Sequence, residues 1–254
     1  MIKICYFSGT GNTLWSAKKI AETLEEECEL INIGLEAEKK EIILEADAVV
    51  ILLPSYAYGQ PLIVRKFVQK AVFKTPYIAA FVTYGTSPGG TLAETARILR
   101  RKGTKGSFFG RIPAVENYIA IFGPPKPKIT ERRLQMQREA TEEAVRCIAE
   151  RRSNSINTFR PFSAFVSLLF TIALKFFYKW YKLSGDCDGC GECEKTCPVS
   201  AITIKDGHPE FNSKCEHCQG CLSYCPKKAI QFGRLKPGVP RYHHPEISIR
   251  EIAR

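Results

Sequence analysis

Cysteine is almost absent from the first part of this 254-residue chain, where the first 146 residues contain only Cys5 and Cys28. The chain also begins without a long apolar run or a cleavage site, so we expect no secretory signal. Both absences argue against a disulfide-rich secreted protein and favour a reducing cytoplasm. Eight of the eleven cysteines lie instead between Cys187 and Cys225, and clustered cysteines in such a compartment usually bind metal.

Acidic residues are missing from residues 151–182, which contain six basic residues and no Asp or Glu. The whole chain has 37 Lys and Arg against 26 Asp and Glu, a formal charge of +11. Residues 1–150 carry +4 and residues 183–254 carry +1, so these 32 residues supply more than half of the excess. The basicity is therefore local, and we expect no nucleic-acid partner.

Apolar runs alternate with amphipathic ones up to residue 151. Strands that alternate with helices predict a parallel sheet covered on both faces, whose ligands bind beyond the carboxyl ends of the strands. The expected strands are residues 2–7, 29–33, 47–53, 77–83 and 108–112, and the expected helices are residues 12–27, 61–72, 91–101 and 131–151.

A loop rich in Gly and Thr, residues 7–13, separates the first expected strand from the first expected helix. Its glycines allow a tight turn with inward N–H groups, and the helix N-terminus behind it favours negative charge, so the loop suits a phosphate. It is neither a P-loop, because no Gly-Lys-Ser/Thr follows, nor a G-x-G-x-x-G turn. The candidate phosphate-binding residues are Ser8, Thr10, Gly11, Asn12 and Thr13.

Four of these residues, Ser8, Thr10, Gly11 and Thr13, match the (S/T)-x-T-G-x-T fingerprint, so residues 1–150 resemble the flavodoxin family. The resemblance implies a five-stranded parallel sheet of order 2-1-3-4-5, with FMN at its carboxyl edge. Many flavodoxins carry an acidic residue after the Tyr-Gly of the fourth-strand loop, where this chain has Thr86. The tyrosines of the strand-end loops, Tyr56, Tyr58 and Tyr84, have one alternative to a role in flavin binding, which is ordinary packing within their loops. The resemblance assigns to the isoalloxazine Pro54, Ser55, Tyr56, Tyr58, Gly59, Thr83, Tyr84, Gly85 and Gly90, with Asn117 and Tyr118 as further candidates.

The motif C-x2-C-x2-C-x3-C-P occurs twice after residue 184, with an offset of 28 residues. Three cysteines at this spacing bind three corners of a [4Fe–4S] cluster, and the fourth, followed by Pro, ligates the other cluster. Residues 184–233 thus resemble bacterial two-cluster ferredoxins; two zinc sites are the alternative, although zinc usually takes paired C-x2-C arms. The predicted ligands are Cys187, Cys190, Cys193 and Cys225 for one cluster, and Cys215, Cys218, Cys221 and Cys197 for the other.

Residues 162–182 are expected to form an apolar helix that packs between the two domains. Contact with a membrane surface or docking of a partner is the alternative. A spanning helix needs about 20 mostly apolar residues, and only 13 precede the first lysine of this segment. One narrow polar stripe is expected along the helix, formed by Ser163, Ser167, Thr171, Lys175, Lys179 and Lys182.

The remaining cysteines and the histidines are given no chemical role. Cys5, Cys28 and Cys147 are expected to be small core residues. We expect the four histidines, His208, His217, His243 and His244, to lie on the surface. No Ser-His-Asp set or carboxylate pair indicates hydrolysis, so no catalytic residue is assigned.

The order of the two parts resembles the flavodoxin–ferredoxin fusion proteins of anaerobic microbes. The fold class is then α/β, with a flavodoxin-like domain over residues 1–151, a connecting helix over 152–183, and a small α+β two-cluster ferredoxin domain with its tail over 184–254. The resemblance implies electron transfer between two [4Fe–4S] clusters and FMN, with redox protein partners. Alternatives are an FMN-dependent reductase of a quinone or nitro compound and a redox-sensing module. We expect a cytoplasmic protein, with peripheral attachment to the inner membrane face through residues 162–182 as the alternative.

Overall fold

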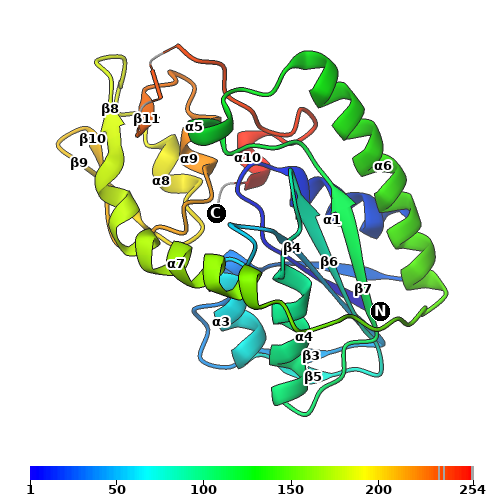
Figure 1. Cartoon of the computed structure of the whole chain (residues 1–254). Coiled ribbons are helices and arrows are strands. Elements are labelled where there is room, and N and C mark those ends of the chain that lie inside the picture. The colour runs from blue at the N-terminus through cyan, green and yellow to red at the C-terminus, as the bar shows by residue number, and fades with distance from the viewer. Residues whose placement is uncertain (234, 237, 253–254) are drawn as a thin grey trace.

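A five-stranded parallel sheet with helices on both faces forms the larger part of the molecule (Figure 1). The computed structural model describes residues 1–233, 235–236 and 238–252. The strand order β2-β1-β4-β6-β7 confirms the predicted topology. The sheet strands are β1 (Ile2–Tyr6), β2 (Cys28–Asn32), β4 (Ala48–Pro54), β6 (Ile78–Tyr84) and β7 (Phe108–Pro113), and β3 (Ile43–Glu45) pairs beside them with β5 (Val72–Lys74).

Helices bury both faces of this sheet, which is why β4 and β6 are apolar at almost every position. Alternation along β1 sends Ile4 toward one core and Cys5 toward the other. The longest helix begins at Pro127, four residues earlier than expected, because proline suits the first turn of a helix. The helices are α1 (Asn12–Thr23), α2 (Ile33–Glu36), α3 (Leu62–Lys70), α4 (Thr91–Arg101), α5 (Ile119–Phe122) and α6 (Pro127–Ala149).

The cysteine-rich part is built from two small antiparallel pairs and two short helices. Strand β8 pairs with β11, so this unit begins at Tyr181, within the segment that the sequence analysis gave to the connecting helix. The other strands form the hairpin between the two cysteine motifs. The elements are β8 (Tyr181–Leu183), α8 (Glu192–Lys195), β9 (Ile202–Lys205), β10 (His208–Phe211), α9 (Gly220–Tyr224) and β11 (Ile230–Phe232).

The connecting segment runs along β7 and then enters α7 (Pro161–Phe177), which continues as a 3-10 turn over Tyr178–Trp180. Asn154 holds the segment, because its side chain bonds the backbone N–H and carbonyl of Phe109 at 2.9 and 3.1 Å. From there α7 crosses the front of the sheet domain to the cysteine-rich unit (Figure 1). Residues 161–180 are long and apolar enough to cross a membrane by length and composition, and only 11% of the most apolar window is buried.

The C-terminal tail returns to the sheet domain rather than staying with the cysteine-rich unit. The His244 N–H donates to the Thr10 carbonyl at 2.8 Å, and the Tyr242 hydroxyl bonds Asn12 Oδ1 at 2.8 Å. Helix α10 (Ile249–Ile252) closes this packing, with Ile252 buried against the same small core as Trp15. The tail thus covers the outer side of the loop that the sequence analysis assigned to phosphate.

Candidate cofactor sites

The loop before α1 presents the unsatisfied N-terminus of a 12-residue helix. No side chain caps α1, and its first turn contains no acidic residue. Gly11 has φ +92, a left-handed conformation that favours glycine. Thr13 and Thr83 share a hydrogen bond of 2.7 Å, which joins the loop to the end of β6. Free helix N–H groups beside hydroxyls are the chemistry that an anionic phosphate requires.

A cavity of about 340 Å³ opens at the carboxyl ends of the sheet strands. This volume lies in the range of small-molecule and cofactor sites. The strand-end loops bring eleven of the predicted residues into its wall, because the carboxyl ends of parallel strands share one edge. Those eleven are Ser8, Thr10, Asn12, Thr13, Pro54, Ser55, Tyr56, Tyr58, Thr83, Tyr84 and Gly85, and Asn117 and Tyr118 join them.

Three predicted glycines do not line the cavity. A Cβ at Gly11 would press on Tyr224 and His244, so this glycine makes room for the C-terminal tail. Gly59 and Gly90 lie under α7, where a Cβ would meet Ser167 and Ser163 respectively. Glycine is therefore needed at these three positions because other chain segments approach closely. Gly9, which was not predicted, does line the cavity.

The loop after β4 folds into a tight turn closed by two backbone hydrogen bonds between Tyr56 and Gly59, at 2.8 and 3.0 Å. Ala57 and Tyr58 both have positive φ, 45° and 68°, which costs free energy for residues with a side chain. The turn directs Tyr56 toward Phe7, which it meets edge-on, and leaves Tyr58 against Phe162 of α7. Tyr56 and Tyr58 thus both line the cavity.

Thr86 occupies the position where many flavodoxins have an acidic residue, and a carboxylate lies next to it from another part of the chain. This carboxylate belongs to Glu116, in the loop after β7. Glu116 Oε2 accepts from the Thr86 N–H at 3.2 Å and from the Thr86 hydroxyl at 3.0 Å. Its other oxygen accepts from the N–H groups of Asn117 and Tyr118. Sequence reasoning missed Glu116 because it lies 30 residues from Thr86 and fits no local motif.

The second cysteine motif also contributes residues to the wall of the cavity. His217, Cys218 and Gln219 line the cavity beside Phe170 and Phe177 of α7. A Cβ on Gly9 would overlap the Cys218 carbonyl oxygen, so the phosphate-loop backbone lies directly against this cysteine. The sequence predicted each motif separately, and no pattern within either motif indicates that they meet.

His217 is buried, contrary to the expectation of a surface position, and so is His244. Burial lowers the pKa of His217 to about 3, so its imidazole is neutral. His217 Nδ1 lies 3.1 Å from the Tyr181 hydroxyl, and its Nε2 lies 3.2 Å from Gln219 Nε2 and 2.9 Å from the Tyr118 hydroxyl. These contacts form a buried polar network between the two parts of the molecule.

One acceptor in this network has no partner among the described residues: the side-chain oxygen of Gln219, which is buried. Because Gln219 lines the cavity, a bound molecule with an N–H or O–H group would satisfy that oxygen. The free helix N-terminus, the aromatic faces and this acceptor together fit a flavin mononucleotide, which carries a phosphate, a flat ring system and a ring N–H.

The four cysteines predicted for one cluster line a single small hollow. Cys187, Cys190, Cys193 and Cys225 come together there with backbone turns and apolar side chains such as Ile204 and Ile230. The charges of Cys225 and Cys190 both raise the pKa of Cys193, which reaches about 11 chiefly through burial. The first motif and the last cysteine of the second motif are thus neighbours, as the crossed pairing predicts.

The other four cysteines are also mutual neighbours, and they lie deeper in the molecule. Burial raises the pKa of Cys218 and of Cys215, and the charge of Cys197 raises both further, so the last cysteine of the first motif lies beside the second motif. Backbone N–H groups point at these sulfurs: Ala201 N–H to Cys197 at 3.1 Å and His217 N–H to Cys215 at 3.4 Å. Such donors stabilise the thiolate form that a cluster requires.

The cysteine arrangement does not suit a mononuclear metal ion. Within residues 1–233, 235–236 and 238–252, no group of three or more His, Cys, Asp or Glu side chains is placed to hold one ion. A zinc site needs four ligands around a single atom. A four-iron cluster is larger and takes thiolates at its outer corners, so these two sets of four fit the cluster better than zinc.

Comparison with known proteins agrees with this geometry. A model described as a flavodoxin domain matches residues 3–110, and a model described as a 4Fe-4S dicluster domain matches residues 186–230. The chain is 44% identical over 47 residues to a protein of Methanosarcina acetivorans that is named as a subunit of an ion-translocating oxidoreductase complex. That match covers 18% of this chain and 18% of the archaeal protein.

Two solved structures resemble part of this chain. The rubredoxin:oxygen oxidoreductase of Desulfovibrio gigas is 17% identical, with a TM-score of 0.35, over 57% of this chain and 36% of that protein. An azoreductase from Bacillus anthracis is 13% identical, with a TM-score of 0.37, over 59% of this chain and 100% of that protein.

Proposed function

The chain is a fusion of a flavodoxin domain and a 4Fe-4S dicluster ferredoxin domain, and from this premise we propose that it passes electrons between its two clusters and its flavin within one molecule. Its cofactors are accordingly FMN and [4Fe–4S] clusters. When bound, the clusters exchange single electrons and FMN exchanges one or two. The chain's own residues supply placement, burial and hydrogen bonds.

One observation carries the proposal: Cys218, a predicted ligand of the second cluster, is part of the wall of the flavin cavity. Gly9 of the phosphate loop lies directly against its backbone, so the ligand and the flavin site are in contact. The fusion replaces a diffusional encounter between two proteins with a fixed geometry. Tyr118 and His217 link the two domains by a hydrogen bond of 2.9 Å and hold this arrangement.

The first cluster site is where a partner exchanges electrons. Cys190 is exposed, whereas Cys197 and Cys221 of the second site are buried. Electrons then pass from a redox protein at the Cys190 edge to the inner site and on to the flavin, or in the reverse direction. The similarity to a subunit of an ion-translocating oxidoreductase complex supports a redox protein as the partner.

Anaerobic purification followed by iron, sulfide and flavin analysis tests this assignment. We expect about eight iron and eight sulfide per chain, from two four-iron clusters, together with one FMN. Cys190→Ser lowers the iron content by removing a ligand of the outer site, and the flavin content stays unchanged because Cys190 does not line the flavin cavity. Zinc in place of iron, or the absence of flavin from protein refolded with excess FMN, would contradict the assignment.

The cavity also favours a second candidate, an FMN-dependent reductase of a small acceptor. Its outer part is lined by Ile121, Phe122 and Phe170, beyond the residues assigned to the flavin ring. An apolar opening of this kind admits a flat hydrophobic molecule such as a quinone. Turnover of the loaded protein with quinones and nitro compounds separates this function from that of a carrier, which reduces them no faster than free FMN does.

A further inference from the structure

Helix α7 is placed with its apolar face outward. Ser163 lies against Gly90 and Ser167 is buried against Gly59, so the small polar side chains face the sheet domain. The outward side is formed by large apolar residues, which we call the α7 face. These are Phe162, Phe165, Leu168, Leu169, Ile172 and Phe176, each between 51% and 69% exposed.

The polar residues of this segment therefore do not form a single stripe on one side of the helix, as was predicted. Residues four apart on a helix differ by about 40° in direction, so the stripe turns around α7. It begins at Ser163 and Ser167, which face the protein, and reaches Lys175 and Lys179, which are exposed. The prediction that α7 packs between the domains describes its inner side only. Phe177, on that side, packs against Phe232 and His217 of the cluster domain.

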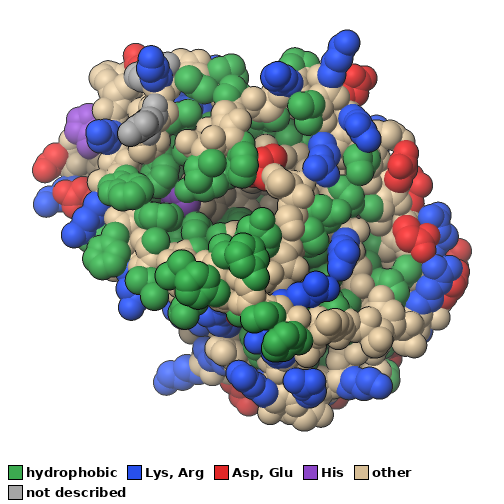
Figure 2. All heavy atoms as spheres, viewed as in Figure 1, with side chains coloured by type: hydrophobic (Ala, Val, Ile, Leu, Met, Phe, Trp, Pro, Cys, Tyr) green, Lys and Arg blue, Asp and Glu red, His purple; other side chains and the backbone are tan. Residues whose placement is uncertain are grey.

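Exposed hydrophobic side chains gather on one side of the molecule (Figure 2). They cover α7 and border a hollow between α7 and α5, where Ile121 and Phe122 of the cavity lining are also exposed. Large contiguous apolar patches are rare on soluble monomers, and they mark surfaces that another phase or molecule covers. The mouth of the flavin cavity thus opens on the same side as the α7 face.

The charged side chains of α7 and of the turn that follows it are all positive, while the carboxylate of Glu116 lines the cavity beside them. Lys175 and Lys179 continue the exposed side of the helix, and Lys182 follows it. None of these three lysines forms an ion pair within the part of the chain that the structure describes. Residues 151–182 contain no acidic side chain, and Trp180 lies among the lysines, half exposed. This arrangement suits an anionic membrane surface: the apolar residues match the acyl chains, tryptophan matches the interface, and the lysines match the negatively charged headgroups.

We propose that the α7 face binds the surface of an anionic bilayer. The apolar side chains enter the boundary between headgroups and acyl chains, and the three lysines lie among the lipid phosphates. The helix lies on the membrane and does not cross it, because its serines remain packed on Gly59 and Gly90. In this position the mouth of the flavin cavity faces the lipid, which gives the site access to apolar molecules dissolved there.

Flotation of the purified full-length protein with vesicles tests the proposal. We expect the protein to float with an equal mixture of phosphatidylcholine and phosphatidylglycerol, and to float at least about tenfold less with phosphatidylcholine alone, because an anionic surface attracts the three lysines. The charge-reversed variant Lys175→Glu/Lys179→Glu/Lys182→Glu loses the preference for anionic vesicles. Failure of the wild-type protein to float with anionic vesicles would overturn the proposal.

The apolar contribution is tested by Phe165→Gln/Leu168→Gln/Leu169→Gln, which changes three exposed residues of the α7 face. Binding falls at least about tenfold, since three large apolar side chains no longer leave water when the protein binds. The matched control is Leu35→Gln/Ile43→Gln/Val72→Gln, which changes three exposed apolar residues on other elements and leaves flotation unchanged. Circular dichroism confirms that each variant is folded.

Two other occupants of the α7 face give distinct results. If a second copy of this chain covers it, light scattering shows a dimer that the Phe165 triple variant dissociates, and the wild type does not float. If α7 spans the bilayer, the bound protein resists extraction at alkaline pH and high salt. Either result would refute surface binding. Flotation requires neither flavin nor clusters, so its outcome is independent of the proposed electron transfer.

Discussion

At position 9 the lack of a side chain determines how closely the two cofactor sites approach. The backbone there lies directly against the carbonyl of Cys218, and a Cβ on Gly220 would lie 3.0 Å from the Gly9 carbonyl oxygen. Glycine is required for this contact because any Cβ at position 9 would overlap the cysteine backbone. The contact is made by backbone atoms, and no hydrophobic pattern in the sequence could reveal it.

We predict that Gly9→Ala separates the phosphate loop from the second cysteine motif. Overpacking of this kind costs about 1–3 kcal/mol of unfolding free energy, so the apparent Tm falls by about 2–12 °C and FMN binding weakens. The control is Gly185→Ala, because a Cβ there meets nothing within 4 Å. Equal Tm values for the two variants would show that the loops do not touch.

His244 illustrates a different residue-scale effect, in which burial changes protonation. Its ring stacks on Trp15 at 5.0 Å between centroids, and Nδ1 accepts from the Glu246 N–H at 3.3 Å. Burial lowers the pKa of His244 to about 4, while the carboxylate of Glu246 opposes this shift. The imidazole is therefore neutral in the folded protein at neutral pH, where its Nδ1 serves as an acceptor.

We predict that docking of the tail weakens as the pH falls from 6.5 toward 4. In this window the unfolded imidazole binds a proton and the folded one does not, so unfolding is favoured by up to about 1.4 kcal/mol per pH unit. His244→Asn keeps an acceptor without titrating, and its stability declines less steeply with acid. Fluorescence of Trp15 in a Trp180→Phe background reports the transition; identical pH slopes for the two proteins would disprove this role.

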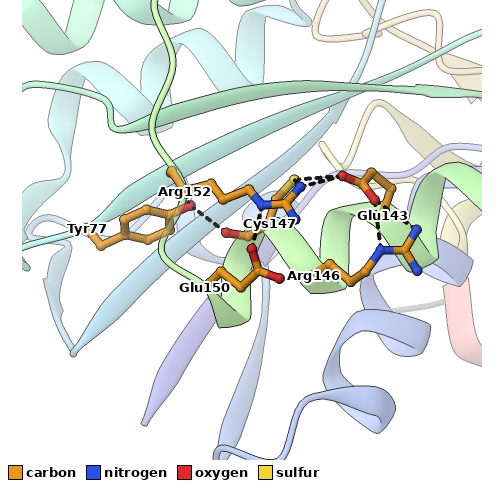
Figure 3. Close-up of polar contacts among 6 residues, drawn as sticks. All are labelled: Tyr77, Glu143, Arg146, Cys147, Glu150 and Arg152. Carbon is orange, nitrogen blue, oxygen red and sulfur yellow. Dashed lines mark hydrogen bonds and ion pairs between the residues drawn. The ribbon is translucent and has the colours of Figure 1, made fainter.

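At the scale of elements, the segment between α6 and α7 is held by a compact polar cluster (Figure 3). The Tyr77 hydroxyl lies 3.3 Å from the Cys147 carbonyl and 3.0 Å from the Arg152 carbonyl. Arg152 in turn bonds Glu143 and Glu150, so the end of α6 is tied to the start of the connecting segment. The cluster therefore fixes the start of the segment that leads to α7.

We predict that Tyr77→Phe loosens the connecting segment and lowers the unfolding free energy by about 1–2 kcal/mol, because the Arg152 carbonyl loses its donor while the Cys147 carbonyl keeps only the Arg152 N–H. Hydrogen exchange of residues 150–160 measures the loosening and should become faster. Tyr178→Phe is the control, since its hydroxyl has no hydrogen-bond partner within the described parts of the chain. Unchanged exchange in Tyr77→Phe would mean that the cluster does not anchor the segment.

Regular elements could be predicted from sequence because their burial is periodic. The strands β4 and β6 are buried on both sides, and their runs of apolar residues identified them as strands. The order of the sheet followed from the resemblance to flavodoxins, and the structure confirms it. Helix α7 could be predicted as a helix, but its orientation could not, because apolar residues cover most of its surface and two small serines decide which side packs inward. Hydrophobicity alone predicts burial of that apolar surface, whereas here it is exposed.

On the scale of the whole molecule, three segments distant in sequence enclose one cavity. The phosphate loop, helix α7 and the second cysteine motif all line it, with Ser8, Phe170 and Cys218 as representatives. The sequence motifs predicted both cofactor sites, because each motif is local and follows from ligand spacing. Their contact, the carboxylate of Glu116 and the return of the tail to Thr10 depend on tertiary packing, so no local pattern encodes them.

The most direct test of the central claim is flash photoreduction of the fully loaded, anaerobic protein, with flavin and cluster absorbance followed separately. Because Cys218 lines the flavin cavity, electrons should equilibrate between cluster and flavin within one chain. The account predicts a first-order rate constant that stays the same at all protein concentrations. A rate that rises in proportion to protein concentration would show that electrons pass between molecules and would contradict the account.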